Sequence, residues 1–151
     1  MIKIRRADIS DIDTYFKWAN EDSVRKLSFN SEKISYDDHV KWFKNQLLNR
    51  DCFMFIFFSN IDFGQVRIQK ISNIDAVISI SLDKNFRGKG IGVQMLMMSI
   101  ELFRKSFPLI IINAYIKIEN GASKNIFEKS GFSLKEVLIY NSYKSFHYIN
   151  S

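Results

Sequence analysis

Glycine and cationic residues are concentrated in one short stretch near the middle of the chain. From Arg87 to Gly92 the sequence reads RGKGIG, so three glycines and two cations precede an apolar run that contains no proline. Glycines allow a ligand to approach the backbone closely, and a helix N-terminus presents unpaired N–H groups and the positive end of the helix dipole. Anions bind at such helix ends. The stretch therefore predicts a binding site for a phosphate or a pyrophosphate.

Two common phosphate-binding loops do not fit this stretch. The dinucleotide-binding fingerprint needs G-x-G-x-x-G, but Val93 follows Gly92 and the third glycine comes too early. A Walker loop needs G-x-x-x-x-G-K-[ST], whereas Lys89 is followed by Gly90. An ordinary strand-to-helix turn needs one glycine rather than three. A different phosphate-binding arrangement is therefore the better explanation.

Composition and charge narrow the class of protein that carries this stretch. The 151 residues, 46% of them hydrophobic, are enough for a sizeable core, and we expect a single domain over residues 1–151. The net charge of +6 favours a phosphate-rich partner. The basic residues are scattered and no RRM, KH or helix-turn-helix pattern occurs, so we expect no nucleic-acid partner.

Cysteine usage and hydropathy indicate the compartment. Cys52 is the only cysteine and lies in an apolar run, which excludes a disulfide and a cysteine-based metal site, and we expect no metal. The N-terminal residues lack the apolar core of a signal peptide, and no apolar run reaches the length needed to span a bilayer. We therefore expect a soluble, cytoplasmic protein without a membrane partner.

The elements that must position the glycine stretch follow from hydrophobic periodicity. Apolar runs predict buried strands at residues 52–58 and 109–118, and a strand at residues 75–83 leads into the glycine stretch. One helix then runs to about Lys105, and another runs over residues 120–129 and ends before a glycine. With the flanking segments the order is β-α-α-β-β-β-α-β-α-β-β, which predicts one mixed α/β domain.

The glycine stretch and a second stretch further along the chain resemble the two signatures of the GNAT N-acetyltransferases. RGKGIG at Arg87–Gly92 resembles the acyl-CoA signature R/Q-x-x-G-x-G/A, and NGAS at Asn120–Ser123, followed by EKSGF at Glu128–Phe132, resembles N-x-x-S/A and E-K-x-G-F. Their order, spacing and surrounding elements match over nearly the whole chain. The resemblance implies the GNAT fold, with a mixed central sheet of about seven strands flanked by helices and splayed central strands that hold acetyl-CoA.

The resemblance also implies how acetyl-CoA binds as co-substrate. Its pyrophosphate is expected on the backbone N–H groups of Arg87–Gly92, and its pantetheine arm beside the strand that ends at Leu82. Asn120 is expected to hydrogen-bond the pantetheine, while an N-cap of the following helix is a second role for it. The cofactor-binding residues that we predict are Ile80, Leu82, Arg87, Gly88, Lys89, Gly90, Ile91, Gly92, Asn120 and Ser123.

Two residues that usually perform acid–base chemistry in the family are replaced in this chain. Many members carry a glutamate base on the third strand and a tyrosine proton donor in the second signature, and the matching positions here hold Val77 and Phe127. One explanation is a non-catalytic module that binds acyl-CoA. The other is chemistry that needs little acid–base help, because positioning alone supplies about 7–11 kcal/mol in favourable cases and the weakly basic amine of an amino-sugar is partly neutral at pH 7.

Other polar residues are candidates for moving the protons. Acetyl transfer needs a neutral amine and a proton for the leaving sulfur. Candidates for relaying the amine proton through water are Asp75, Ser79 and Ser81. Candidates for donating a proton to the sulfur are Tyr115, Tyr140 and Ser130. Among these, the catalytic residues that we predict are Ser79, Ser81 and Tyr115.

Polar residues interleaved with two tryptophans predict the site of the acceptor. The set consists of Trp18, Asn20, Arg25, His39 and Trp42, with Arg25 in a loop and the last two on one face of a helix. A structural alternative places both tryptophans in the core and leaves His39 as a partly exposed helix residue. The mixture suits a sugar or a nucleotide, because aromatic faces stack and arginine pairs with phosphate.

The same region resembles one branch of the family. The pattern W-x-N-x-x-x-V-R, followed by I-x-x-x-x-H-x-x-W, is similar to that of the enzymes that acetylate nucleotide-linked amino-sugars, including UDP-4-amino-sugars. The resemblance implies a small-molecule amine acceptor, an amino-sugar nucleotide. The alternative acceptors are a protein N-terminus, as in the acetyltransferases of ribosomal proteins, and a small amine. Strands near the C-terminus can pair between subunits, so we expect a monomer or a homodimer.

Overall fold

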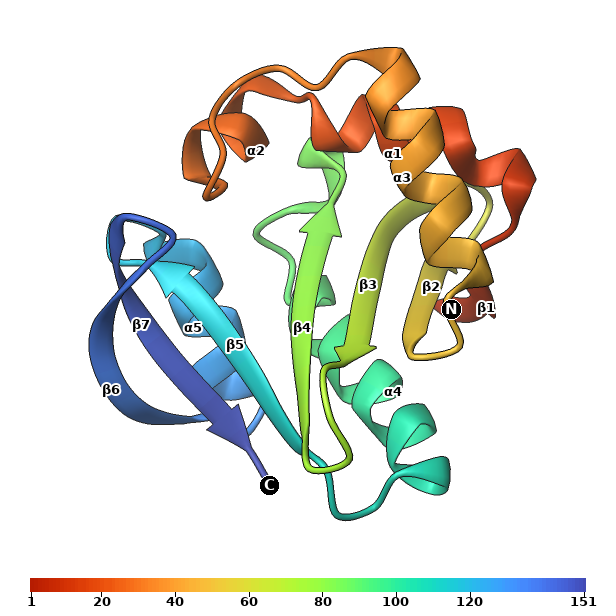
Figure 1. The fold of residues 1–151 in the computed structure, drawn as a ribbon. Helices are drawn as coiled ribbons and strands as arrows, with labels where there is room; N and C mark the ends of the chain where they lie inside the picture. Colours follow the sequence, from red (N-terminus) through yellow and green to blue (C-terminus); the bar gives the residue numbers. More distant parts are fainter.

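A seven-stranded mixed sheet forms the centre of the molecule, whose computed structural model describes residues 1–151 (Figure 1). The strand order is β1-β2-β3-β4-β5-β7-β6, and every neighbouring pair is antiparallel except β4 and β5, which are parallel. The strands are β1 Lys3–Arg6, β2 Cys52–Phe58, β3 Asp62–Lys70, β4 Asp75–Leu82, β5 Ile111–Lys117, β6 Ser133–Tyr140 and β7 Tyr143–Asn150. The predicted α/β class and the sheet of about seven strands are thereby confirmed.

Helices cover both faces of this sheet. The α-helices are α1 Ile12–Ala19, α2 Asp22–Leu27, α3 Tyr36–Leu48, α4 Ile91–Ser106 and α5 Gly121–Lys129, and the short 3-10 helices are η1 Ile9–Asp11 and η2 Lys84–Phe86. None of them combines the length and the apolar character that a membrane-spanning helix needs.

Strand β2 shows why the sheet can be covered on both sides. Its sequence CFMFIFF is apolar at every position, so alternate side chains enter two different cores. Phe55 and Phe57 belong to the larger core, which includes residues of α4 and α5. Met54 and Ile56 belong to the smaller core, which includes residues of α1 and α3. The two helical layers are thus fixed on opposite faces of one strand.

Strands β4 and β5 are paired at one end only. Their parallel register covers Asp75, Ala76 and Val77 on β4, so residues 78–82 have no partner strand on the β5 side. Asn113 on β5 holds the paired end together, because its Nδ2 donates to Asp75 Oδ1 (2.9 Å) and to the carbonyl of Ala76 (3.0 Å). The separated strands confirm the splayed centre that the family resemblance implies.

Residues 22–27 form helix α2, where the sequence pattern predicted a loop that contains Arg25. A helix of six residues is too short to display an apolar stripe, so periodicity could not reveal it. Asp22 in its first turn and Arg25 and Lys26 in its last turn complement the helix dipole. Figure 1 shows α2 at the end of the sheet where β4 and β5 separate. The predicted order of elements is therefore corrected by one additional helix.

Candidate active site

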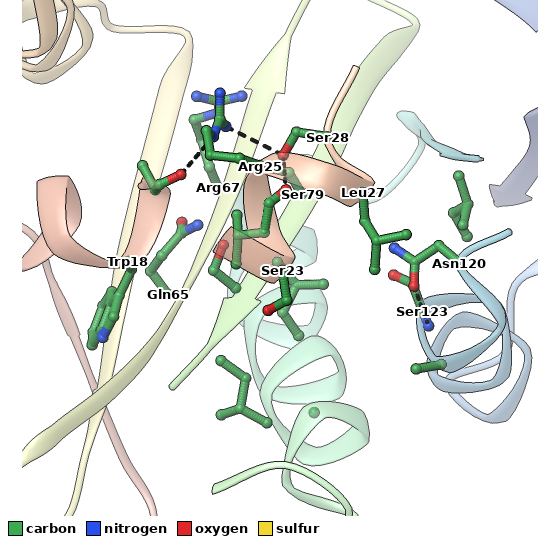
Figure 2. Close-up of a pocket in the computed structure, with 18 of the residues that line it drawn as sticks. Trp18, Ser23, Arg25, Leu27, Ser28, Gln65, Arg67, Ser79, Asn120 and Ser123 are labelled. Carbon is green, nitrogen blue, oxygen red and sulfur yellow. Dashed lines mark hydrogen bonds between the residues drawn. The ribbon is translucent and has the colours of Figure 1, made fainter. Parts of the chain in front are cut away.

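A large cavity lies where β4 and β5 separate, and it has two halves. Its volume is about 1090 Å³. The loop half is lined by residues of the glycine stretch and of α5, namely Arg87, Gly88, Gly90, Ile91, Gly92, Asn120 and Ser123. The helix half is lined by residues of α1 to α3 and of the strands that face them, including Trp18, Arg25, His39, Trp42, Gln65, Arg67 and Ser79. Figure 2 shows Asn120 and Ser123 on the wall opposite Gln65, Arg67 and Ser79.

The glycine stretch forms an open helix N-terminus in the loop half. Gly88 and Gly90 adopt the left-handed conformation, with φ of +76° and +75°, which glycine tolerates best. Gly90 is the N-cap of α4, and no side chain caps this helix. The N–H groups of its first turn therefore lack a side-chain acceptor, which suits a bound pyrophosphate. The residues present fit the diphosphate of acetyl-CoA.

Gly92 has a packing role in addition to its place beside the cavity. A Cβ added at this position would lie 3.0 Å from Cδ1 of Ile126 on α5. Gly92 is buried within α4, so the absence of a side chain lets α4 and α5 approach closely. The sequence pattern predicted only a ligand contact here, because a helix–helix contact between distant segments leaves no local signal.

The two cations of the glycine stretch lie in different surroundings. Arg87 forms a two-armed ion pair with Glu21 (2.7 and 3.1 Å), and its Nε donates to the carbonyl of Leu82 (3.0 Å). Burial opposes ionisation of Glu21, but hydrogen bonds from Ser23 and Arg87 outweigh it and lower the pKa of Glu21. Lys89 does not line the cavity, and its Nζ lies 5.9 Å from the ring centre of Phe86.

Asn120 caps helix α5 at the rim of the loop half. Its Oδ1 accepts a hydrogen bond from the backbone N–H of Ser123 (3.2 Å). The side-chain Nδ2 has no hydrogen-bond partner within the chain, so it stays available to a ligand. Asn120 therefore has the capping role that the sequence left open, through its Oδ1. In the same rotamer its Nδ2 can make the predicted contact with pantetheine. Ile80 and Leu82 of β4 also line the cavity.

The three predicted catalytic residues line the cavity in different ways. Ser79 and Ser81 of β4 lie on one face, opposite Arg67 and Gln65 of β3 in the strand register. Tyr115 of β5 is stacked between two rings, with centroid distances of 4.0 Å to Tyr140 and 4.5 Å to His147. Burial and the neighbouring Tyr140 raise the pKa of Tyr115, so its hydroxyl is protonated at neutral pH and able to donate.

The remaining proton-transfer candidates are engaged elsewhere. The carboxylate of Asp75 accepts from Asn113 at the strand joint, and the hydroxyl of Ser130 donates to the carbonyl of Ile126 (2.7 Å). Phe127, at the position of the usual tyrosine, is 3% exposed and packs edge-on against Phe132. Of the proton-transfer candidates, Ser79, Ser81 and Tyr115 are the ones that line the cavity.

The predicted acceptor residues divide into supporting and accessible side chains. Trp18 is buried, as the structural alternative expects. His39 is 2% exposed, with its Nε2 donating to the carbonyl of Ile12 (2.8 Å), so it is more buried than that alternative expects. Asn20 exchanges two hydrogen bonds with the backbone of Ile34 and does not line the cavity. Trp42 keeps 36% of its surface exposed. Trp42 is therefore the aromatic side chain of this set that a ligand can reach.

Arg25 supports the wall of the helix half. Its guanidinium donates to the carbonyls of Ala19 (2.6 Å) and Asn30 (2.8 Å) and to the hydroxyl of Ser28 (3.2 Å). Burial lowers the pKa of Arg25. These bonds fasten the segment between α2 and α3 to the end of α1. Arg25 thus shapes the acceptor region through the backbone, with its donors already engaged.

Three polar residues on the strands of the cavity wall were not singled out from the sequence. They are Gln65 and Arg67 on β3 and Lys117 on β5. Lys117 is 2% exposed, and its Nζ lies 3.7 Å above the ring of Tyr143 and 3.4 Å from the carbonyl of Lys26. Alternation along β3 puts Gln65 and Arg67 on the face opposite Val66 and Ile68, so period-two analysis of that strand would have found them.

Comparison with known proteins agrees with this geometry. Residues 2–133 match the model of the acetyltransferase (GNAT) domain. No curated protein matches the chain. Similar solved structures include the spermidine N-acetyltransferase from Vibrio cholerae in complex with CoA and spermine, at TM-score 0.86 and 16% identity over 98% of this chain and 93% of that chain.

Two further structures show how widely this fold is shared. The aminoglycoside acetyltransferase AAC(6')-Ib in complex with coenzyme A has TM-score 0.84 and 14% identity over 100% of this chain and 95% of that chain. The ribosomal-protein α-N-acetyltransferase RimL in complex with coenzyme A has TM-score 0.85 and 19% identity over 99% of this chain and 93% of that chain. The family match covers most of the sequence and confirms the family inferred from the two signatures. The chain therefore belongs to the GNAT family of acetyl-CoA-dependent N-acetyltransferases.

Proposed function

We propose that this acetyltransferase transfers the acetyl group to the primary amine of a nucleotide-linked amino-sugar. The observation that carries the proposal is the charge of the cavity wall. Its cations are Arg25, Lys33, Arg67, Arg87, Lys117 and Lys129, whereas its carboxylates are Glu32 and Asp38, both exposed. Positive potential in a cleft attracts anionic ligands and disfavours polycations. A polyamine or an aminoglycoside is therefore a poor fit.

The shape of the cavity supports the same class of acceptor. The helix half extends the cavity beyond the space that the pantetheine arm needs, and the partly exposed ring of Trp42 offers a face on which a sugar or base can stack. With the diphosphate on the N–H groups of Gly88–Gly92, the unpaired edge of β4 directs the thioester toward the helix half. The acceptor amine enters from that side.

The proposed chemistry uses few protein groups. The amine nitrogen attacks the thioester carbonyl carbon, and the C–S bond breaks as the amide forms. A water held by the hydroxyls of Ser79 and Ser81 takes the proton from the nitrogen, and the hydroxyl of Tyr115 gives a proton to the sulfur. A weakly basic amino-sugar amine needs no stronger base, which agrees with valine at position 77.

A protein N-terminus is the second acceptor that we tested against the geometry. The bonds from Asn20 and Arg25 hold the segment between α2 and α3 against α1, and this segment forms one wall of the helix half. An extended peptide would need a groove that continues along its length, whereas a compact sugar nucleotide needs only the space beside this wall. Membership in the family favours an enzyme over a non-catalytic acyl-CoA-binding module.

Release of free thiol from acetyl-CoA tests the proposal directly. The purified protein is incubated with acetyl-CoA and one amine at a time: a UDP-4-amino-sugar, a peptide with a free N-terminus, spermidine or kanamycin. We expect kcat/KM for the UDP-4-amino-sugar to exceed that of the others at least 100-fold. Turnover of peptides alone would contradict the sugar assignment, and coenzyme A binding without turnover of any amine would contradict catalysis.

A further inference from the structure

The guanidinium of Arg67 has no anionic partner, although it lies at the floor of the helix half. Arg5 pairs with Asp11 and Asp62, and Arg87 pairs with Glu21. Arg67 makes no hydrogen bond or ion pair within the chain. Its guanidinium carbon lies 5.1 Å from the ring centre of Trp42, which is a cation–π contact. Burial lowers the pKa of Arg67. The side chain is half-buried, and a partly desolvated charge without an anionic partner marks a place for a ligand.

Two neutral groups beside Arg67 also lack partners. The Oε1 atom of Gln65 and the hydroxyl of Tyr15 are both buried without a hydrogen bond, and both residues line the cavity. Gln65 lies two residues from Arg67 on the same face of β3. Burial raises the pKa of Tyr15, and the charge of Arg67 opposes that shift, which places the two groups within electrostatic reach. A buried polar group without a hydrogen bond destabilises the protein, and a bound ligand that supplies the missing bond would relieve that cost.

We propose that Arg67 anchors an anionic group of the acceptor, a second anion site separate from the glycine stretch. The guanidinium binds a phosphate or carboxylate of the acceptor, and Gln65 Oε1 accepts a hydrogen bond from a hydroxyl or amine of the same molecule. Arginine presents two parallel N–H donors to such groups. The inference deepens the proposed function, since it names the site that recognises the acceptor. It rests on only one part of that function, namely acetyl transfer to an amine whose molecule also carries an anionic group.

The register of the sheet fixes how far this anion lies from the reacting amine. Arg67 pairs directly with Ser79 on β4, whose far edge is unpaired. Neighbouring strands are about 4.8 Å apart, so the anion site lies roughly one to two strand spacings from the expected thioester. A suitable acceptor therefore carries its amine and its anion a sugar ring apart. The long separation between amine and anion in an extended peptide does not match this spacing.

Steady-state kinetics with matched acceptors test the site. The probes are two pairs that differ in the anionic group: a UDP-4-amino-sugar with its methyl glycoside, and glucosamine 6-phosphate with glucosamine. Arg67→Met keeps the aliphatic stem against Trp42 and removes the charge. In the pair that is turned over, we expect Arg67→Met to raise KM at least 30-fold for the anionic member and less than 3-fold for the neutral member. The KM for acetyl-CoA should stay within 2-fold of the wild-type value. Arg67→Lys should recover part of the loss.

Arg6→Met is the matched control. Arg6 also lies over aromatic rings, those of Phe53 and Phe55, but it is on the edge strand β1 and does not line the cavity. This variant should behave as the wild type. If Arg67→Met proves unstable, Arg67→Lys replaces it. Inhibition by uridine diphosphate, competing with the amine at saturating acetyl-CoA, is then compared between Arg67→Lys and the wild type.

The outcomes separate this inference from the proposed function. An equal rise of KM for the charged and neutral members of a pair, or a loss of acetyl-CoA affinity, overturns the anion site. Turnover of glucosamine 6-phosphate but not of the UDP-4-amino-sugar, with the expected dependence on Arg67, overturns the nucleotide assignment and supports the anion site. Turnover of the UDP-4-amino-sugar that is insensitive to Arg67→Met supports the proposed function and overturns the anion site.

Discussion

The loop half and the helix half of the cavity are built by opposite strategies. In the loop half, backbone N–H groups and two left-handed glycines form the binding surface, and they come from one continuous stretch of six residues. In the helix half, side chains from α1, α3, β3 and β4 meet across long sequence separations. On the proposed assignment, backbone recognition of a diphosphate is encoded locally, whereas recognition of the acceptor depends on packing.

The two halves also differ in how their charges are satisfied. The exposed cation of the loop half, Arg87, already has Glu21 as a partner, so a diphosphate must share it or displace the carboxylate. Arg67, a cation of the helix half, makes no hydrogen bond or ion pair within the chain. The first arrangement suits a cofactor that every catalytic cycle exchanges. The second suits a site whose partner is the substrate itself.

Gly90→Val gives the largest expected effect and tests whether the loop half depends on backbone shape. A β-branched residue at φ +75° is strained, and its side chain would stand where the diphosphate must approach. We expect coenzyme A affinity to fall at least 100-fold by calorimetry. Lys89→Ala, which keeps the backbone and removes a charge, should change it less than 5-fold. A larger effect of Lys89→Ala would show that charge dominates.

Tyr115→Phe tests the boundary between the halves. Loss of a proton donor typically lowers rates by about 100-fold or more, and we expect kcat to fall about 100-fold with KM for acetyl-CoA unchanged. Because burial and Tyr140 raise the pKa of Tyr115, the donor stays protonated to higher pH than an ordinary tyrosine, so the alkaline decline of kcat should lie at higher pH than an ordinary tyrosine would give. Tyr140→Phe keeps the stacked ring and should leave kcat near the wild-type value. A normal kcat for Tyr115→Phe would remove it from the mechanism.

Asn120 substitutions separate a structural role from a binding role in the loop half. Asn120→Ala removes the N-cap of α5 and should lower the free energy of unfolding by about 1 kcal/mol. Asn120→Asp keeps the capping oxygen but loses the Nδ2 donor, so stability should be retained while coenzyme A affinity falls about 5–10-fold. Chemical denaturation and calorimetry provide the two measurements. Unchanged affinity in both variants would leave Asn120 as a cap alone.

Glu21→Gln gives the smallest expected effect and tests the paired charge. Freeing Arg87 should raise coenzyme A affinity about 2–5-fold, since the diphosphate no longer competes with a carboxylate. The pKa of Glu21 is lowered, so the ion pair is complete at pH values above the ordinary carboxyl pKa of 4.5 and is lost as pH falls through the lower folded value. The gain should therefore be present at pH 7. Weaker binding by Glu21→Gln would mean that Glu21 positions Arg87 for the diphosphate.

The sequence by itself determined the fold class and the loop half. Apolar alternation defined the strands, and the glycine stretch with NGAS and EKSGF identified the family, because these signals lie within single segments. It missed helix α2, whose six residues hold no periodic pattern. The sequence also predicted a ligand contact for Gly92 but did not reveal that this glycine packs against Ile126.

Only the tertiary structure decided how the acceptor region is arranged. Residues chosen by type, such as Asn20, Arg25 and His39, form hydrogen bonds to backbone atoms of the chain and support the wall. Arg67, which no motif marks, makes no hydrogen bond or ion pair within the chain. The physical reason is that a polar side chain is free for a ligand only when no nearby group satisfies it. That condition depends on which distant segments the fold brings together.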